Sequence, residues 1–123
     1  MANVLDKIIE DKKVSLKAIK EANSLDSIEN TIKSLNNFLN FKEVITDNKG
    51  ASLITEIKKA SPSAGELVKD FNHLNIAKMY VDNGATCLSV LTEEKHFLGK
   101  LDYIRDIKNK FKIPVLAKDF FID

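Results

Sequence analysis

Three short apolar runs alternate with two helix-like segments after residue 50, and this alternation most constrains the fold. The runs at 51–58, 86–91 and 113–121 have the length of strands and are rich in aliphatic and β-branched residues. The segments at 73–85 and 101–111 carry apolar residues at helical spacing. Strands that alternate with helices predict a parallel sheet built from right-handed βαβ crossovers.

The first 45 residues have a different pattern, without a strand-like run. Apolar residues recur at helical spacing in two stretches, 5–19 and 25–39, with charged residues between them. Asp26 followed by Glu29 is typical of a capping box at a helix start. We therefore expect residues 1–45 to form an N-terminal helical extension.

Two architectures fit the alternating segments: an open doubly wound sheet and a (β/α)8 barrel. No Gly-x-Gly-x-x-Gly follows a predicted strand, which weakens the dinucleotide-binding version of the open sheet. Charged residues stand at the C-terminal ends of the first and third predicted strands, where barrel enzymes place catalytic groups. We therefore expect an α/β fold in which residues 46–123 form a partial (β/α)8 TIM barrel, with the first three parallel strands and two crossover helices.

Composition excludes several classes of partner. The formal net charge is +1, so no bulk electrostatic argument favours nucleic acid or an anionic membrane. No apolar run approaches the roughly 20 residues of a spanning helix, and the N-terminus has no secretory signal core. One cysteine, Cys87, fits a reducing cytoplasm and sits in an apolar run, which indicates a buried, inert thiol. His73 and His96 lack partners at metal-ligand spacing, so we expect no metal site.

The charged strand ends are the candidate site. Glu56 and Lys58 are two residues apart and should project from one face of the first strand. Lys118 stands at the end of the third strand, so the three side chains should converge at a barrel mouth. A carboxylate with two ammonium groups suits an anionic substrate and proton transfer. The alternative is a structural ion pair at a strand end.

Two loops next to these strands could also contact a ligand. Ser61, Ser63 and Gly65 follow the first strand, either as an anion-contacting loop or as a plain turn in which Gly65 has a positive φ. Phe97 lies in a polar loop after the second strand, where it is either a helix-packing anchor or a lid over a flat aromatic substrate.

Three motifs carry a resemblance to a known family. The stretches "EIKKASPSAG", "YVDNGATCLSVLTEEKHFLGKLDYI" and "IPVLAKDFFID", in this order, resemble indole-3-glycerol phosphate synthase, a (β/α)8 barrel enzyme of tryptophan biosynthesis. The opening "VLDKIIEDKKVSLKAIK" is similar to the N-terminal helical extension of that family. The resemblance implies a lyase that closes the indole ring of 1-(2-carboxyphenylamino)-1-deoxyribulose 5-phosphate with loss of carbon dioxide and water, without cofactor or metal.

The same resemblance implies roles for individual residues. Lys118 would be the general acid that protonates the substrate carbonyl oxygen. Lys58 would contact the anionic substrate and assist proton transfer, and Glu56 would position these groups by hydrogen bonding. The residues that would lie around the carboxyl-bearing ring are Ser61, Pro62, Leu91, Phe97 and Phe120.

Chain length sets a further expectation. A barrel of this kind needs eight strands and about 250 residues, whereas this sequence predicts three strands. We therefore expect an N-terminal fragment that is inactive alone and that covers its open sheet edges by forming a homo-oligomer. The alternatives are another phosphosugar barrel enzyme, which should carry an acidic or cysteine acid–base instead of this lysine, and a non-catalytic half-barrel that serves as a binding or oligomerisation module.

Overall fold

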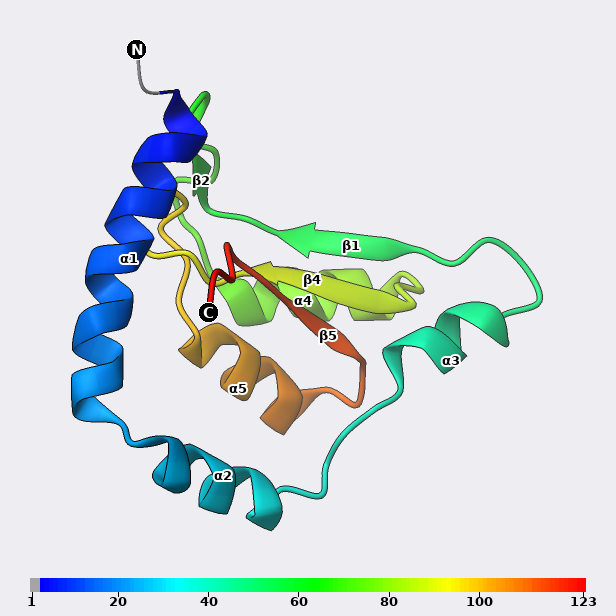
Figure 1. The fold of residues 1–123 in the computed structure, drawn as a ribbon. Helices are drawn as coiled ribbons and strands as arrows, with labels where there is room; N and C mark the ends of the chain where they lie inside the picture. Colours follow the sequence, from blue (N-terminus) through cyan, green and yellow to red (C-terminus); the bar gives the residue numbers. More distant parts are fainter. Residues whose placement is uncertain (1–2) are drawn as a thin grey trace. The chain divides into compact units, whose positions relative to one another are not determined.

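The computed structural model describes residues 3–123 and begins with helices, which are followed by alternating strands and helices (Figure 1). The elements are α1 (Val4–Ala22), α2 (Leu25–Ser34), α3 (Phe41–Thr46), β1 (Ile54–Ile57), β2 (Ala60–Ser61), β3 (Gly65–Glu66), α4 (His73–Asp82), β4 (Cys87–Leu91), α5 (Asp102–Lys110) and β5 (Val115–Lys118). No helix among these residues is both long and apolar enough to cross a membrane.

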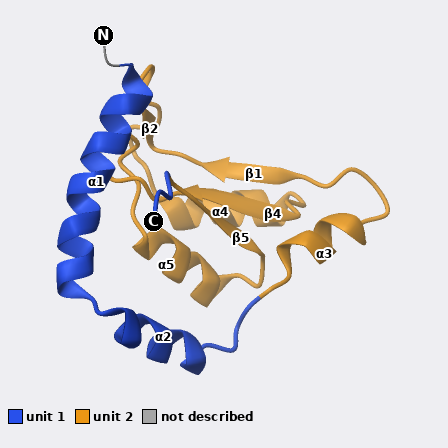
Figure 2. Cartoon of the chain, viewed as in Figure 1, with its two compact units in different colours: residues 1–38, 120–123 blue, residues 39–119 orange. Residues whose placement is uncertain are grey.

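The chain divides into two compact units (Figure 2). One unit comprises residues 1–38 and 120–123, and the other comprises residues 39–119. The division into an N-terminal extension over 1–45 and a barrel part over 46–123 stays a prediction.

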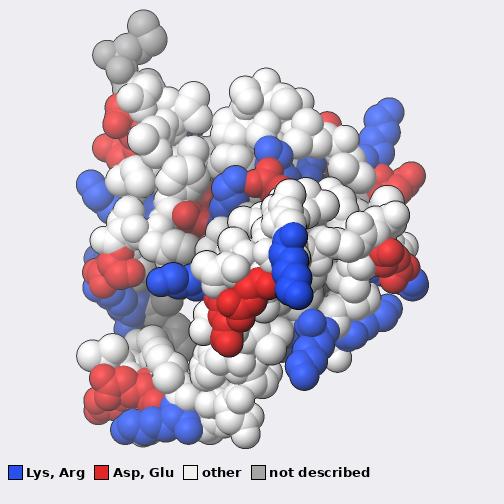
Figure 3. Space-filling view, turned by 90° about the vertical axis from the view of Figure 1, so that its right-hand side faces the viewer, with Lys and Arg blue, Asp and Glu red and all other residues white. Residues whose placement is uncertain are grey.

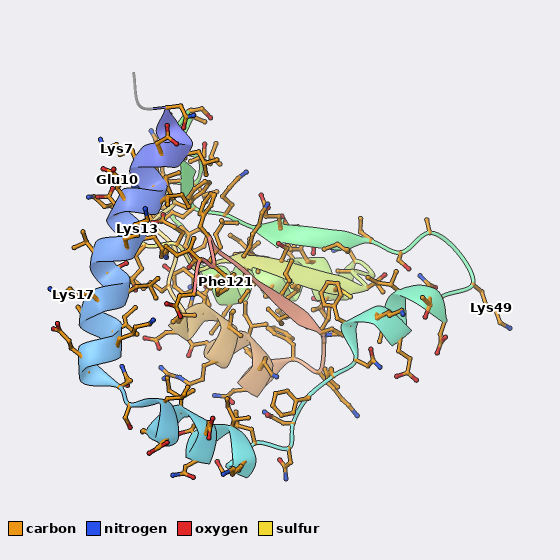
Figure 4. All side chains as sticks on the ribbon, in the orientation of Figure 1. Lys7, Glu10, Lys13, Lys17, Lys49 and Phe121 are labelled. Atoms are coloured by element: carbon orange, nitrogen blue, oxygen red, sulfur yellow. The ribbon has the colours of Figure 1, made fainter. Side chains whose placement is uncertain are left out.

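The first unit contains α1 and α2. α1 begins with a reciprocal cap, because the Asn3 side chain accepts the Asp6 N–H at 2.8 Å and the Asp6 carboxylate accepts the Asn3 N–H at 3.1 Å. Four charged side chains that lie along this helix are labelled in Figure 4, namely Lys7, Glu10, Lys13 and Lys17.

The start of α2 differs from the predicted capping box. Ser24 is the N-cap, and its hydroxyl accepts the Ser27 N–H at 3.2 Å. Asp26 instead lies in the first turn, where a negative charge is favourable. α2 ends at Ser34, earlier than predicted, because the following residue has extended backbone angles (φ −86°, ψ 135°).

The six-residue helix α3 was not predicted. It begins after Asn40, whose side chain accepts the Glu43 N–H at 3.1 Å. A helix of this length offers less than two turns of apolar periodicity, so the hydrophobic pattern could not reveal it.

The second unit holds a three-stranded parallel sheet in the order β1-β4-β5, so its three strands lie side by side in their order along the chain. α4 and α5 supply the two crossovers, and both pack on the same face of the sheet. The buried cluster on that face contains Ile57, Ala77, Leu88, Val90, Ile107 and Ile113. This arrangement confirms the α/β class and is that of the opening units of a (β/α)8 barrel.

The opposite face of the sheet carries the charged strand ends. Glu56 is in register with Ser89, and Ser89 is in register with Leu116. Leu91 pairs with Lys118 one step nearer the C-terminal ends of the strands. Side chains alternate along a strand, so these five project away from the helices.

The connections on either side of α4 contain a short strand pair and two glycines with positive φ. The β1–α4 loop contains a short antiparallel ladder between β2 and β3, which was not predicted. Gly65 in this ladder has φ +67°, as expected for a turn glycine. Gly84 has φ +88° directly after the C-cap Asn83, the left-handed conformation that commonly follows a helix end.

Candidate functional site

Glu56 is the centre of a three-residue charge cluster. The Lys58 Nζ lies 2.9 Å from Glu56 Oε1, and the Lys118 Nζ donates a hydrogen bond to Glu56 Oε2. Each carboxylate oxygen therefore has one ammonium partner. The structure brings together the three side chains that the sequence predicted to converge, although their catalytic roles stay predictions.

The sheet geometry explains how these side chains meet. β1 and β5 are not neighbours, because β4 lies between them, so their backbones are about 10 Å apart. The β4 residue in register with Glu56 is Ser89, which has a small side chain. The long Lys118 side chain can therefore reach Glu56 across the central strand.

Hydrogen bonds fix the backbone beside both strand ends. The Tyr80 hydroxyl of α4 donates to the Glu56 carbonyl oxygen at 3.1 Å. The Thr92 N–H donates to the Lys118 carbonyl oxygen at 3.0 Å, and the Thr92 hydroxyl donates to Asp119 Oδ2 at 2.9 Å. The two charged strand ends thus have anchored backbones, which limits the freedom of the side chains above them.

The charges around Glu56 stabilise its ionised form. Burial raises the pKa of the carboxyl group, but hydrogen bonds and Coulomb attraction from Lys118 and Lys58 outweigh burial and hold the pKa below its ordinary value of 4.5. The side chains remain partly open to solvent, with exposed fractions of 30% for Glu56, 33% for Lys58 and 52% for Lys118. The cluster is therefore partly desolvated and lies at the C-terminal ends of β1 and β5.

The depressed pKa predicts a pH-dependent contribution to stability. A carboxyl group with a lower pKa in the folded state stabilises the fold above its unfolded pKa, and this stabilisation is lost as the pH falls through the folded pKa. The difference in unfolding free energy between the wild type and Glu56→Gln should therefore be constant above about pH 5.5 and shrink in more acidic solution. Urea unfolding of both proteins between pH 7 and pH 3 measures this difference. A gap that stays constant down to pH 3 would contradict the assigned pKa direction.

The loop after β1 contains two of the predicted substrate-contact residues, Ser61 and Pro62. The Ser61 hydroxyl oxygen accepts the Ala64 N–H at 3.2 Å, and Pro62 is exposed at the turn. Lys59 and Glu66 form an ion pair across the small ladder, with Lys59 Nζ 3.8 Å from Glu66 Oε1. This loop is held by its own hydrogen bonds, and contact of Ser61 and Pro62 with a substrate stays a prediction.

The three predicted apolar contact residues have different surroundings. Leu91 at the end of β4 is buried, and Phe97 in the following loop is half-buried. Phe120 belongs to the other compact unit. Their contact with an aromatic ring stays a prediction.

Thr92 and Glu93 are functional candidates that sequence reasoning missed. Both are buried polar residues directly after β4, with exposed fractions of 2% and 4%. In the sequence, the stretch "LTEEK" has the composition of an ordinary polar loop. The adjacent Glu94 is exposed. Only the three-dimensional structure separates the buried glutamate from its exposed neighbour.

His73 and Cys87 lie in surroundings that indicate a structural role. His73 Nε2 lies 2.9 Å from Asp106 Oδ2, and its ring stacks on Tyr103 with centroids 4.4 Å apart, which joins α4 to α5. Within residues 3–123, no three His, Cys, Asp or Glu side chains gather as a metal site would require. Cys87 is buried, as predicted, and burial raises the pKa of its thiol. Basic and acidic side chains are interspersed on the face shown in Figure 3.

Comparison with known proteins gives a consistent result over nearly the whole chain. The family model described as indole-3-glycerol phosphate synthase matches residues 5–123. The indole-3-glycerol phosphate synthase of Clostridium acetobutylicum is 45% identical over 121 residues, which cover 98% of this chain and 46% of the relative. The protein of the same name from Chlorobium chlorochromatii is 43% identical over 97% of this chain and 47% of the relative. The chain spans about half the length of the curated relatives it matches.

Proposed function

Because the chain belongs to the indole-3-glycerol phosphate synthase family, we propose that it supplies the opening part of a lyase of tryptophan biosynthesis. The substrate is 1-(2-carboxyphenylamino)-1-deoxyribulose 5-phosphate, and the reaction closes the indole ring with loss of carbon dioxide and water. The observation that carries this proposal is the placement of two ammonium groups, from Lys58 and Lys118, on the single carboxylate of Glu56 at the strand ends. A reaction on a phosphorylated metabolite also fits a protein of the cytoplasm.

Lys118 has the chemistry of a general acid for ring closure. In that step, the aromatic carbon that carries the carboxylate attacks the substrate carbonyl carbon, and the carbonyl oxygen gains electron density. An ammonium group stabilises the developing negative charge and can transfer a proton to it. The bond to the carboxylate then breaks as carbon dioxide leaves, and its electron pair restores the aromatic ring. The new hydroxyl group departs as water with a second proton, while the neighbouring CH2 carbon loses a proton to a base, which forms the double bond of the indole ring.

Lys58 and Glu56 would prepare the site for this step. The substrate is an anion at both its carboxylate and its phosphate, and Lys58 offers a positive charge at the end of β1. Glu56 holds both ammonium groups by hydrogen bonds and ion pairing, so it orients them before the substrate enters. Within the second compact unit, Ser61, Pro62, Leu91 and Phe97 would contact the aromatic ring.

A chimera tests this proposal. It joins residues 1–123 to the part of the Clostridium acetobutylicum relative that lies beyond the aligned region, since the two proteins are 45% identical where they align. We expect the chimera to form indole-3-glycerol phosphate from the substrate, as measured by indole absorbance or fluorescence. An inactive chimera that is folded by circular dichroism would contradict the proposal and favour a non-catalytic half-barrel.

Residues 1–123 alone are proposed to be inactive. They hold a three-stranded parallel sheet, whereas a complete barrel site draws on the ends of strands from the whole circle of eight. The isolated polypeptide in the same assay should give no product above the uncatalysed background. Sustained indole formation by this polypeptide would contradict its proposed inactivity.

The isolated polypeptide is also proposed to self-associate. β1 and β5 are the edge strands of the sheet, and edge strands offer unpaired backbone groups to other chains. Ile54 on β1 and Leu116 on β5 are each 48% exposed on the face opposite the helices. Analytical ultracentrifugation should detect dimers or larger oligomers at micromolar concentration, and a monodisperse monomer would contradict this proposal.

A further inference from the structure

Glu93 is a buried carboxylate that holds the loop after β4. Its Oε2 accepts the N–H groups of His96 at 2.7 Å and Phe97 at 2.9 Å, and its Oε1 accepts the Lys95 N–H at 3.2 Å. The Glu93 carbonyl oxygen also accepts the Gly99 N–H at 2.8 Å. One residue therefore organises the backbone from 95 to 99.

The burial of Glu93 requires these partners. Its exposed fraction is 4%, and a buried carboxylate without hydrogen bonds would be strongly unfavourable. Three backbone N–H groups aimed at one side chain supply the compensation. The same bonds satisfy N–H groups of a segment that has no helix or strand to pair with, so the carboxylate and the loop conformation depend on each other.

The rest of the loop permits few alternative conformations. A Cβ atom at Gly99 would lie 2.3 Å from the Leu91 carbonyl oxygen, so only glycine fits this close approach to the strand end. Leu98 has φ +53°, which is rare for a residue with a side chain. At its other end, the loop begins with Thr92, which is hydrogen-bonded to the Lys118 carbonyl oxygen.

We propose that Glu93 is a positioning residue for the substrate site. Its carboxylate fixes the backbone of residues 95–97 and thereby sets where the Phe97 side chain lies. Thr92 ties the start of the same loop to the strand end that carries Lys118, so the aromatic side chain and the general acid are held in one hydrogen-bonded frame. The loop-fixing role rests on the geometry, whereas the benefit to catalysis rests on the proposed contact of Phe97 with the aromatic ring.

Amide hydrogen exchange in the 1–123 chain tests the loop-fixing role. In Glu93→Ala, the amides of Lys95, His96 and Phe97 should exchange about tenfold or more faster than in the wild type, because their acceptor is gone. Glu94→Ala is the matched control, since Glu94 is the adjacent, exposed glutamate, and its exchange rates should equal those of the wild type. Unchanged exchange at these three amides in Glu93→Ala would overturn the proposal.

Glu93→Gln provides a rescue with a distinctive pattern. The glutamine carbonyl oxygen can take the place of Oε2 and accept from His96 and Phe97, whereas its NH2 group cannot accept from Lys95. Protection should therefore return at His96 and Phe97 and stay low at Lys95. Equal loss at all three amides in this variant would contradict the assigned acceptor geometry.

Kinetics in the chimera separate this inference from the proposed function. Glu93→Ala and Phe97→Ala should each raise KM about 3- to 10-fold, with a smaller change in kcat, because each weakens the same aromatic contact. If Phe97→Ala leaves KM unchanged while the exchange results stand, the proposed ring contact fails and the loop-fixing role survives. If Phe97→Ala raises KM and Glu93→Ala does not, the positioning role is wrong.

Discussion

Replacing Lys118 with methionine in the chimera is expected to lower kcat/KM by about 10²- to 10⁴-fold, the usual effect of removing a general acid. Methionine keeps most of the apolar stem and removes the ammonium group. Glu56 Oε2 loses its partner in this variant, while the Lys58 ammonium remains on Oε1. Steady-state assays of indole-3-glycerol phosphate formation measure the loss.

Lys112→Met is the matched control for this substitution. Lys112 is exposed and precedes β5, at the opposite end of the strand from Lys118. Its replacement should leave kcat/KM within about twofold of the parent, as expected for a surface change away from the site. Equal losses in the two variants, or a loss below about tenfold in Lys118→Met, would contradict the proposed acid role of Lys118.

Replacing Ile107 with alanine is expected to lower the unfolding free energy of the 1–123 chain by about 2–5 kcal/mol. Ile107 is fully buried on α5 and packs in the cluster that contains Leu88 and Val90 of the central strand. Truncation removes buried methyl groups and leaves a cavity between the helix and the sheet. Since domains of this size have a total stability of about 5–15 kcal/mol, the loss is a large share of it.

Met79→Ala is the control for the core substitution. Met79 lies on α4 with an exposed fraction of 57%, and its truncation should change the unfolding free energy by less than about 0.5 kcal/mol. Urea unfolding followed by circular dichroism measures both variants. Similar small effects for the two would show that α5 does not pack on β4 as described.

The strand–helix alternation was predictable because buried parallel strands and their crossover helices leave strong patterns. β4 is buried on both faces and appears in the sequence as the continuous apolar run at 86–91. In contrast, α3 was too short for a periodic signal, and the β2–β3 ladder has two residues on each strand.

The candidate site was predictable to a lesser extent. Strand alternation placed Glu56 and Lys58 on one face, and parallel pairing brought Lys118 to the same edge of the sheet. The sequence could not reveal that Ser89 leaves room for Lys118 to reach across β4. Nor could it distinguish Glu93 from Glu94, because the difference lies in burial and in three backbone hydrogen bonds.

The central claim is that the charged side chains at the ends of β1 and β5 work as one catalytic unit. A double-mutant cycle in the chimera tests it, with kcat/KM measured for Glu56→Gln, Lys118→Met and the variant that carries both changes. Residues that act together are strongly non-additive, so the double variant should be within about threefold of Lys118→Met alone. Losses that multiply in the double variant would show that the two side chains act independently and would contradict the account.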